Sequence, residues 1–157
     1  MQTFLVGESY TATAKCLDRQ RLGKQRVEGY QILRTLLGET HGWARHLAVL
    51  MWAGYESDLW LYTRIMCAEW KERGYQDSIS EKLTCLEQRY PDKLLLLPDI
   101  YPPWLLGTPL CASHRAALLA KDPAHYSRFG WTEEPDINYW WPTKHLDARQ
   151  ESPAQGG

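Results

Sequence analysis

The chain has 157 residues, a formal net charge of −1 and four cysteines without a CxxC pair. A domain of this length buries roughly 70% of its unfolded surface, so it needs neither disulfides nor a structural metal, and we expect reduced cysteines in a cytoplasmic protein. The near-neutral charge excludes a protein that coats nucleic acid without specificity. The longest apolar run, residues 94–98, is too short for a membrane span.

Helical periodicity dominates the chain after residues 1–13, which predict an extended or looped start. It predicts helices near 14–37, 43–53, 56–73, 78–90 and 112–120, with stops at Gly38 and Gly74. Five prolines within 90–109 predict an ordered loop there. The fold class is therefore all-α. We expect one compact bundle of about five helices with long ordered loops over residues 1–147, and a disordered tail at 148–157.

The first long helix carries most of the positive charge in residues 1–50. At about 100° per residue, Leu22, Gly29 and Leu33 share a buried face, and a polar stripe lies beside it. The ordinary interpretation of this stripe is a solvated face with a Lys24–Glu28 pair. The stripe consists of Arg21, Lys24, Gln25 and Glu28.

Two charged residues of this helix fall inside its apolar sector. Asp18 and Arg26 lie about 40° to either side of Leu22, and burying a charge is costly unless it is paired. A charge network at the edge of a core indicates a functional site. There the Glu28 carboxylate could stabilise a sugar cation or move protons, and the neighbouring cations could hold phosphates.

The histidines do not indicate a metal site. His41 and His46 are five residues apart, which does not place two ligands on one helix face, so we interpret them as capping or hydrogen-bonding residues. The sequence has no glycine-rich phosphate loop and no zinc motif. We expect neither a metal nor a cofactor.

The stretch RQRLGKQRVE, residues 19–28, resembles the endonuclease V-like pyrimidine-dimer DNA glycosylase family, whose phage members are small all-α enzymes. Similar stretches follow in the family's order at GWARHLAVLMWAGYESDLWLY, CAEWKERGYQ and ASHRAALLAKDPAHYSRFGW. Together they cover most of residues 15–131.

The resemblance implies a division of labour. An N-terminal α-amine, here that of Met1, attacks the sugar C1′, and Glu28 assists glycosidic cleavage and β-elimination. Unlike a lysine amine, an α-amine is partly neutral near pH 7. The partner is double-stranded DNA with a flipped nucleotide, bound by a monomer, and the aromatic residues Tyr126, Phe129 and Trp131 stack on bases. The residues implied in DNA binding are Arg19, Arg21, Lys24, Gln25, Arg26, His46, Arg115, Tyr126 and Trp131.

Two positions depart from the family pattern. Gln2 stands where the phage enzyme exposes a threonine by removal of the initiator methionine, so Met1 keeps the amine unless processing exposes Thr3. Val27 replaces the arginine that usually precedes the glutamate, for which Arg26 or Arg21 could substitute.

Three functions stay open from sequence. The first is a DNA glycosylase, with or without abasic-site lyase activity, for damaged or modified pyrimidines. The second is a non-catalytic DNA-binding module on the same scaffold. The third is an enzyme or binder for a nucleotide or other small metabolite, in which the basic helix grips phosphate.

Overall fold

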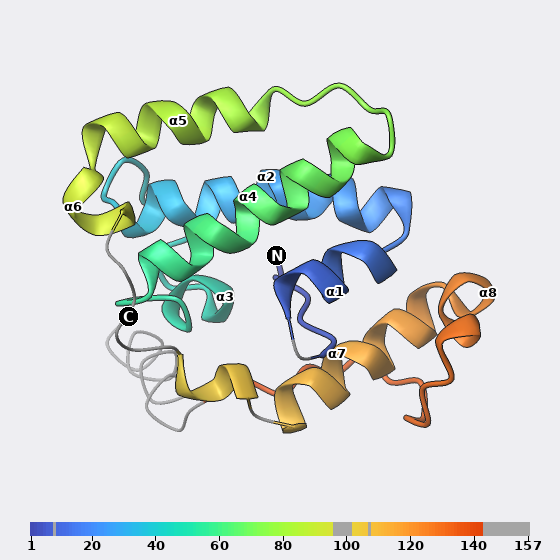
Figure 1. Ribbon diagram of the computed structural model, residues 1–157. Coiled ribbons are helices and arrows are strands. Elements are labelled where there is room, and N and C mark those ends of the chain that lie inside the picture. The colour runs from blue at the N-terminus through green and yellow to red at the C-terminus, as the bar shows by residue number, and fades with distance from the viewer. Residues whose placement is uncertain (8, 96–101, 107, 143–157) are drawn as a thin grey trace, which may run out of the picture.

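Helices make up most of the computed structural model, which describes residues 1–7, 9–95, 102–106 and 108–142 (Figure 1). Within these ranges there is no strand, so the expected all-α class is confirmed. None of the described helices is long and apolar enough to cross a bilayer. The end of the expected domain at 147 and the tail at 148–157 lie outside the described residues. The elements are α1 Tyr10–Cys16, α2 Arg19–Leu36, α3 Leu47–Leu50, α4 Glu56–Glu72, α5 Ile79–Arg89, α6 Pro91–Leu94, η1 Pro103–Leu106, α7 Thr108–Lys121, α8 Pro123–Tyr126 and η2 Ser127–Phe129.

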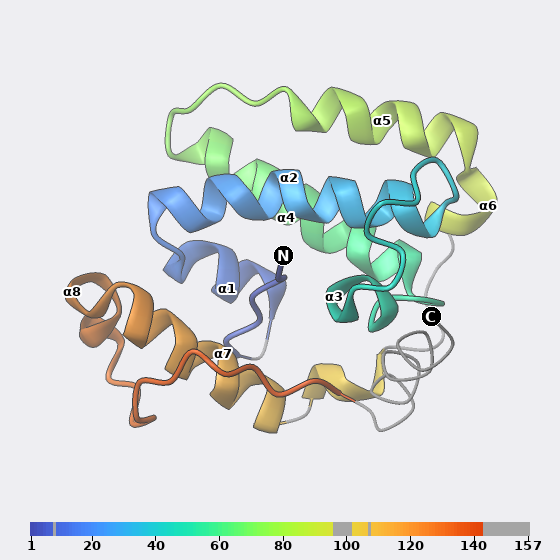
Figure 2. The ribbon, with the colours of Figure 1, turned by 180° about the vertical axis from the view of Figure 1, so that it is seen from behind.

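The helices α2 and α4 cross in the middle of the molecule (Figures 1 and 2). Their close approach depends on Gly29, because a Cβ there would lie 2.3 Å from the Thr63 hydroxyl oxygen. The predicted buried face of α2 meets α4 at this crossing, where Leu22, Leu33 and Tyr62 are completely buried. Helix α5 lies above this pair in both views, and α1, α3 and α7 lie below it.

The predicted helix at 14–37 is two helices, and α1 begins before it, inside the segment predicted to be extended. Ser9 starts α1 by accepting the Ala12 N–H at 3.0 Å. The break falls at Leu17 and Asp18, which have extended backbone angles, and the Asp18 carboxylate then accepts the Arg21 N–H at the start of α2. Periodicity did not reveal this break because the apolar face continues across it.

The remaining helices follow the prediction to different degrees. Helices α4 and α5 match the predicted segments 56–73 and 78–90. The segment 43–53 contains only the short α3, with turns on both sides, because His46 caps it by accepting the Ala48 N–H. Helix α7 is longer than the predicted 112–120, and the described parts of the proline-rich loop include α6 and η1.

After η2 the chain returns along α7 as an extended segment, residues 130–142 (Figure 2). Two backbone N–H groups of the segment bond to α7: Asp136 N–H donates to Ala116 O at 3.1 Å, and Trp140 N–H donates to the Ser113 side-chain hydroxyl at 3.1 Å. This return brings Tyr139 beside the amino-terminal segment, where its ring packs edge-on against Phe4.

Candidate active site

Residues 2–6 are buried in the interior and held by side chains instead of by a neighbouring strand. Because buried backbone groups need partners, each N–H from residue 2 to residue 6 donates to a side-chain acceptor. Glu28 is the first of these acceptors, so the bonding pattern fixes the amino end of the chain against α2. The bonds are Gln2 N to Glu28 Oε2 at 3.2 Å, Thr3 N to Gln2 Oε1 at 2.9 Å, Phe4 N to Gln25 Oε1 at 2.9 Å, Leu5 N to His114 Nδ1 at 3.0 Å and Val6 N to Thr13 Oγ1 at 3.1 Å.

Gln25 is the central connection between this segment and α2. Its amide oxygen accepts the Phe4 N–H, and its amide nitrogen donates to Gln2 O at 3.0 Å and to Glu28 Oε2 at 3.3 Å. The Tyr62 hydroxyl lies 2.7 Å from the Gln25 amide oxygen and 2.8 Å from Phe4 O. Gln25 thus sets both the path of the first residues and the position of the Glu28 carboxylate.

A polar pocket of about 150 Å³ opens where the amino end meets α2. Figure 2 shows the amino terminus between α2 above and the segment 130–142 below, with the loop from α2 to α3 on the right. A wider depression of about 770 Å³ adjoins the pocket along α2, and Gln20, Lys24 and Glu28 line both. The pocket is lined by Met1, Gln2, Phe4, Gln20, Arg21, Lys24, Gln25, Glu28, Lys121 and Tyr139.

The charges of this pocket contribute to shifts in the pKa values of two aromatic residues. Burial, and second the positive charge of the Met1 amino group, hold the pKa of His46 below its usual value. Burial, and second the negative charge of Glu28, raise the pKa of Tyr139. Since His46 Nδ1 accepts the Ala48 N–H at 3.0 Å, the proton of the neutral ring is on Nε2. The amino group therefore acts on His46, and the carboxylate acts on Tyr139.

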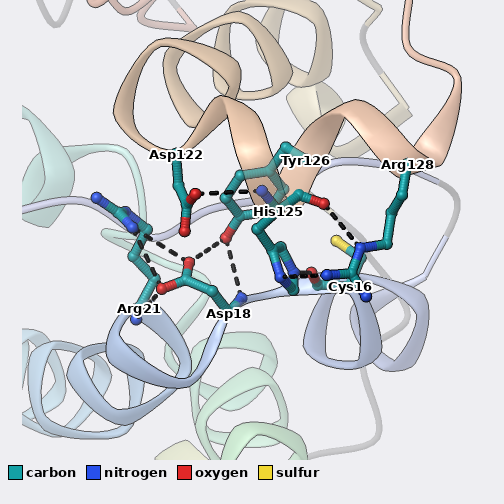
Figure 3. Close-up of polar contacts among 7 residues, drawn as sticks. All are labelled: Cys16, Asp18, Arg21, Asp122, His125, Tyr126 and Arg128. Atoms are coloured by element: carbon teal, nitrogen blue, oxygen red, sulfur yellow. Dashed lines mark hydrogen bonds and ion pairs between the residues drawn. The ribbon is translucent and has the colours of Figure 1, made fainter.

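Arg21, which lines the pocket, is held by Asp18, and Asp18 is bonded to Tyr126 from the carboxyl-terminal half of the chain (Figure 3). Its Nη1 lies 3.2 Å from Asp18 Oδ2, and the Tyr126 hydroxyl donates to Asp18 Oδ1 and accepts the Asp18 N–H at 3.0 Å. Burial opposes ionisation of Asp18, but the bonds from Tyr126 and Arg21 outweigh it and lower the pKa of this carboxyl. Tyr126 and Asp18 therefore fix the direction of the Arg21 side chain.

The structure brings together the predicted polar stripe and the predicted amine. Arg21, Lys24, Gln25 and Glu28 all line the pocket with Met1. Arg19 lies at its margin, along the wider depression, with its guanidinium carbon 5.0 Å from the centre of the Tyr75 ring. Both charged residues of the apolar sector are paired, Asp18 with Arg21 and Arg26 with Asp77.

Thr3, the alternative amino terminus, is packed inside this fold. It is completely buried, and its hydroxyl accepts the Trp52 indole N–H at 2.9 Å. An amino terminus at residue 3 would also lose the bond between Gln2 N–H and Glu28.

The structure corrects the expected role of Tyr126. Its ring is completely buried and its hydroxyl is bonded to Asp18, so it has no face to offer a base. Trp131 is half-buried and stacks on Tyr126 with ring centres 5.6 Å apart, and Phe129 stacks on Trp131 at 5.4 Å. Much of this aromatic cluster is thereby used in packing the end of α7.

Arg26 and Arg115 also have protein partners instead of an open approach to the pocket. Arg26 pairs with the buried carboxylate of Asp77 and lies over Trp70, 4.2 Å from the ring centre. Arg115 donates to Val6 O at 2.7 Å and pairs with Glu133. Neither arginine lines the pocket, and both hold distant segments of the fold together.

Five residues that line the pocket were not among the sequence-predicted site residues: Gln2, Phe4, Gln20, Lys121 and Tyr139. Lys121 ends α7, and Tyr139 lies in the extended segment beyond residue 131, where the family resemblance stops. No spacing rule links either residue to Glu28. The packing of α7 brings Lys121 there, and the return of the chain along α7 brings Tyr139.

The fold and this pocket define an all-α protein with an amino-terminal polar site. The family model described as pyrimidine dimer DNA glycosylase matches residues 1–83, more than half of the chain, so the protein belongs to this family. Membership indicates a glycosylase-type function and a DNA substrate. The match includes α2 and the loop with His46, whereas Lys121 and Tyr139 lie beyond it. No curated protein and no solved structure matches the chain.

Proposed function

We propose that the protein is a DNA glycosylase for damaged or modified pyrimidines, with abasic-site lyase activity, in which the Met1 α-amino group is the nucleophile and Glu28 its acid–base partner. One observation carries the proposal. The Glu28 carboxylate accepts the N–H of residue 2 at 3.2 Å, and Met1 and Glu28 line the same pocket. A carboxylate so close to an amino terminus can assist chemistry at the atom that this amine attacks.

The chemistry follows from these two groups. The lone pair of the neutral amine forms a bond to C1′ while the bond from C1′ to the pyrimidine nitrogen breaks, and the base leaves with that electron pair and takes up a proton. The Glu28 carboxylate stabilises positive charge that develops on the sugar. Loss of an amine proton and opening of the C1′–O4′ bond, whose oxygen is protonated, give a Schiff base. Removal of a C2′ proton then expels the 3′-phosphate.

Three cations around the pocket supply contacts for the DNA backbone. Arg21, Lys24 and Lys121 line it, and Lys24 and Lys121 are exposed. Only Nη1 of Arg21 bonds Asp18 among the described residues, which leaves the other N–H groups of its fork for a phosphate. Double-stranded DNA should therefore bind with a steep negative dependence on salt, whereas a small nucleotide would need few of these contacts.

The test is borohydride reduction with two DNA substrates, one with an abasic site and one with a thymine dimer, followed by mass mapping of the adduct. We expect an adduct on Met1. In Glu28→Gln, the adduct with abasic DNA should persist while base excision falls by about 100-fold or more, the size of a general acid–base contribution. Glu81→Gln, which alters an exposed carboxylate on α5, is the matched control and should leave both unchanged.

Two results would overturn the proposal. An adduct that maps to Lys121 would remove Met1 as the nucleophile. No adduct and no released base with either substrate, while DNA binding remains, would identify a non-catalytic DNA-binding module instead.

A further inference from the structure

Tyr139 reaches the pocket from a part of the chain that lies beyond the family match. It lines the pocket with Met1 and Glu28, whereas the match ends at residue 83. In Figure 2 its segment, residues 130–142, passes below the amino terminus. The next residue, Trp140, holds the backbone at this point because its N–H donates to the Ser113 hydroxyl at 3.1 Å. Tyr139 is therefore a pocket residue that the fold places there independently of α2.

Three neighbouring rings restrict the orientation of the Tyr139 ring. Phe4, His114 and Trp141 each pack edge-on against it, with ring centres 6.2, 5.8 and 5.9 Å away. The ring is half-buried between them. A side chain that is held on several sides has little conformational freedom left to lose when a substrate binds. The fold thus directs the Tyr139 hydroxyl before any substrate arrives.

The hydroxyl of Tyr139 makes no hydrogen bond within the described residues. The completely buried tyrosines use their hydroxyls differently, to join segments of the fold. Tyr62 donates to Phe4 O at 2.8 Å. Tyr126 donates to the Asp18 carboxylate. Because Tyr139 has no such structural bond in the described part of the chain, its O–H group is available to a molecule that enters the pocket.

The surroundings of Tyr139 keep its hydroxyl protonated. Burial, and second the negative charge of Glu28, raise the pKa of Tyr139, and the positive charge of Arg21 opposes them. An ordinary tyrosine already keeps its proton up to about pH 10. The remaining titratable groups that face it are on the amino terminus and α7, namely Met1, His114 and Lys121. Tyr139 is therefore a neutral proton donor at the pH where an α-amine can react.

The proposed chemistry needs a proton donor that Glu28 does not supply. The departing pyrimidine leaves with the electron pair of its bond to C1′ and must take up a proton. Glu28 stabilises positive charge as a carboxylate, and its Oε2 accepts the Gln2 N–H and an N–H of the Gln25 amide. An ionised carboxylate accepts hydrogen bonds and has no proton to donate. A second group at the pocket must therefore protonate the base.

We infer that Tyr139 is a catalytic residue that protonates the leaving pyrimidine at its O2 carbonyl oxygen. This inference rests on the proposed function. O2 is bonded to the ring carbon beside N1, so it receives much of the negative charge when the bond from C1′ to N1 breaks. A proton donor placed at that oxygen lowers the barrier to departure.

The proton balance of this step is closed by the amine itself. As the bond from C1′ to N1 breaks, its electron pair enters the pyrimidine, O2 takes the Tyr139 proton, and the electron pair of the O–H bond stays on the phenolate oxygen. The Met1 nitrogen is positively charged after its attack on C1′. Its excess proton passes through water to the phenolate and restores the Tyr139 hydroxyl. The departed base then moves its proton from O2 to N1 in solution.

The test measures glycosidic cleavage in single turnovers on a duplex with a thymine dimer, read as strand breaks after alkali treatment. Tyr139→Phe removes the proton donor and keeps the ring against Phe4 and His114. Its cleavage rate should fall by about 100-fold or more, the size of a general-acid contribution. Its urea midpoint should not change. Tyr30→Phe is the matched control, because Tyr30 is half-buried on α2 outside the pocket, beside Lys82, and it should keep the wild-type rate.

A second variant examines the proton directly. Difluorotyrosine in place of Tyr139 retains the hydroxyl but makes the phenol more acidic. The rate of cleavage by this protein should decline at a lower alkaline pH than the wild-type rate, because its phenol ionises earlier. A purely structural hydroxyl would not move this decline. Cleavage by Tyr139→Phe at the wild-type rate, or the same alkaline decline in the wild type and the fluorinated protein, would overturn the inference.

Failure of this inference can be told apart from failure of the proposed function. Abasic DNA has no base to protonate, so Tyr139→Phe should form the borohydride-trapped adduct at Met1 as fast as the wild type does. An equal loss of adduct and of cleavage in Tyr139→Phe, with an active wild type, would refute only the role of Tyr139. A wild type that forms no adduct and cleaves no glycosidic bond would refute the proposed function and this inference with it.

Discussion

Replacing Gln25 by leucine removes the connection between the amino-terminal segment and α2 while nearly preserving volume. Gln25 is 1% exposed, and its loss leaves two buried backbone groups without partners, Phe4 N–H and Gln2 O. The Tyr62 hydroxyl can still donate to Phe4 O at 2.8 Å, so it is not orphaned. Each orphaned group costs about 1–3 kcal/mol, which predicts a loss of about 2–6 kcal/mol.

Urea denaturation followed by tryptophan fluorescence measures this free energy of unfolding. The matched control is Gln25→Glu, which keeps the acceptor for Phe4 N–H but places an oxygen where the amide nitrogen faced Gln2 O and Glu28. It should be less damaging at pH 5 than at pH 8, because a protonated carboxyl can still donate to Gln2 O. A loss below about 1 kcal/mol in Gln25→Leu would refute the reasoning.

Three further predictions concern the framework of the site. Gly29→Ala should destabilise the fold by about 1–3 kcal/mol, despite the better helix propensity of alanine, because its Cβ would lie 2.3 Å from the Thr63 hydroxyl oxygen. The double variant Gly29→Ala with Thr63→Ala should recover most of this loss, as measured by thermal melting. Burial lowers the pKa of His114 to about 3, so unfolding takes up a proton below about pH 6.5. The free energy of unfolding should therefore fall towards pH 3 by at most about 1.4 kcal/mol per pH unit. His114→Asn should lack this contribution when its free energy of unfolding is measured by urea denaturation. Tyr126→Phe should cost about 1–3 kcal/mol in the same assay because it removes both bonds to Asp18, and an unchanged stability would contradict the network.

The sequence predicted the parts of the site that lie on one helix. A period of 3.6 residues puts Arg21, Gln25 and Glu28 on one stripe whatever the rest of the chain does, and the structure places this stripe at the pocket. The helical wheel likewise identified Asp18 and Arg26 as charges within the apolar sector that need partners, and the structure supplies them. Both inferences required only local geometry.

Contacts between distant segments could not be predicted in this way. Arg26 is a cation on the basic helix and was therefore expected to contact DNA. Its partner Asp77 lies 51 residues away in the sequence, and only the packing of the helices brings them together. Tyr126 is an ordinary candidate for base stacking until the fold buries it against Asp18, 108 residues earlier. The helix break at Leu17 was also hidden, since a capping aspartate inside a continuous apolar pattern gives no change of period.

The bonds that hold residues 2–6 come from opposite ends of the chain. Thr13 and Gln25 are made early in synthesis, but His114, which accepts the Leu5 N–H, and Arg115, which donates to Val6 O, come from α7. Since a ribosome releases the amino end first, this segment must wait for α7 before it can settle. A nascent chain therefore carries an amino terminus that is not yet anchored, and the polar pocket assembles only when translation is well advanced.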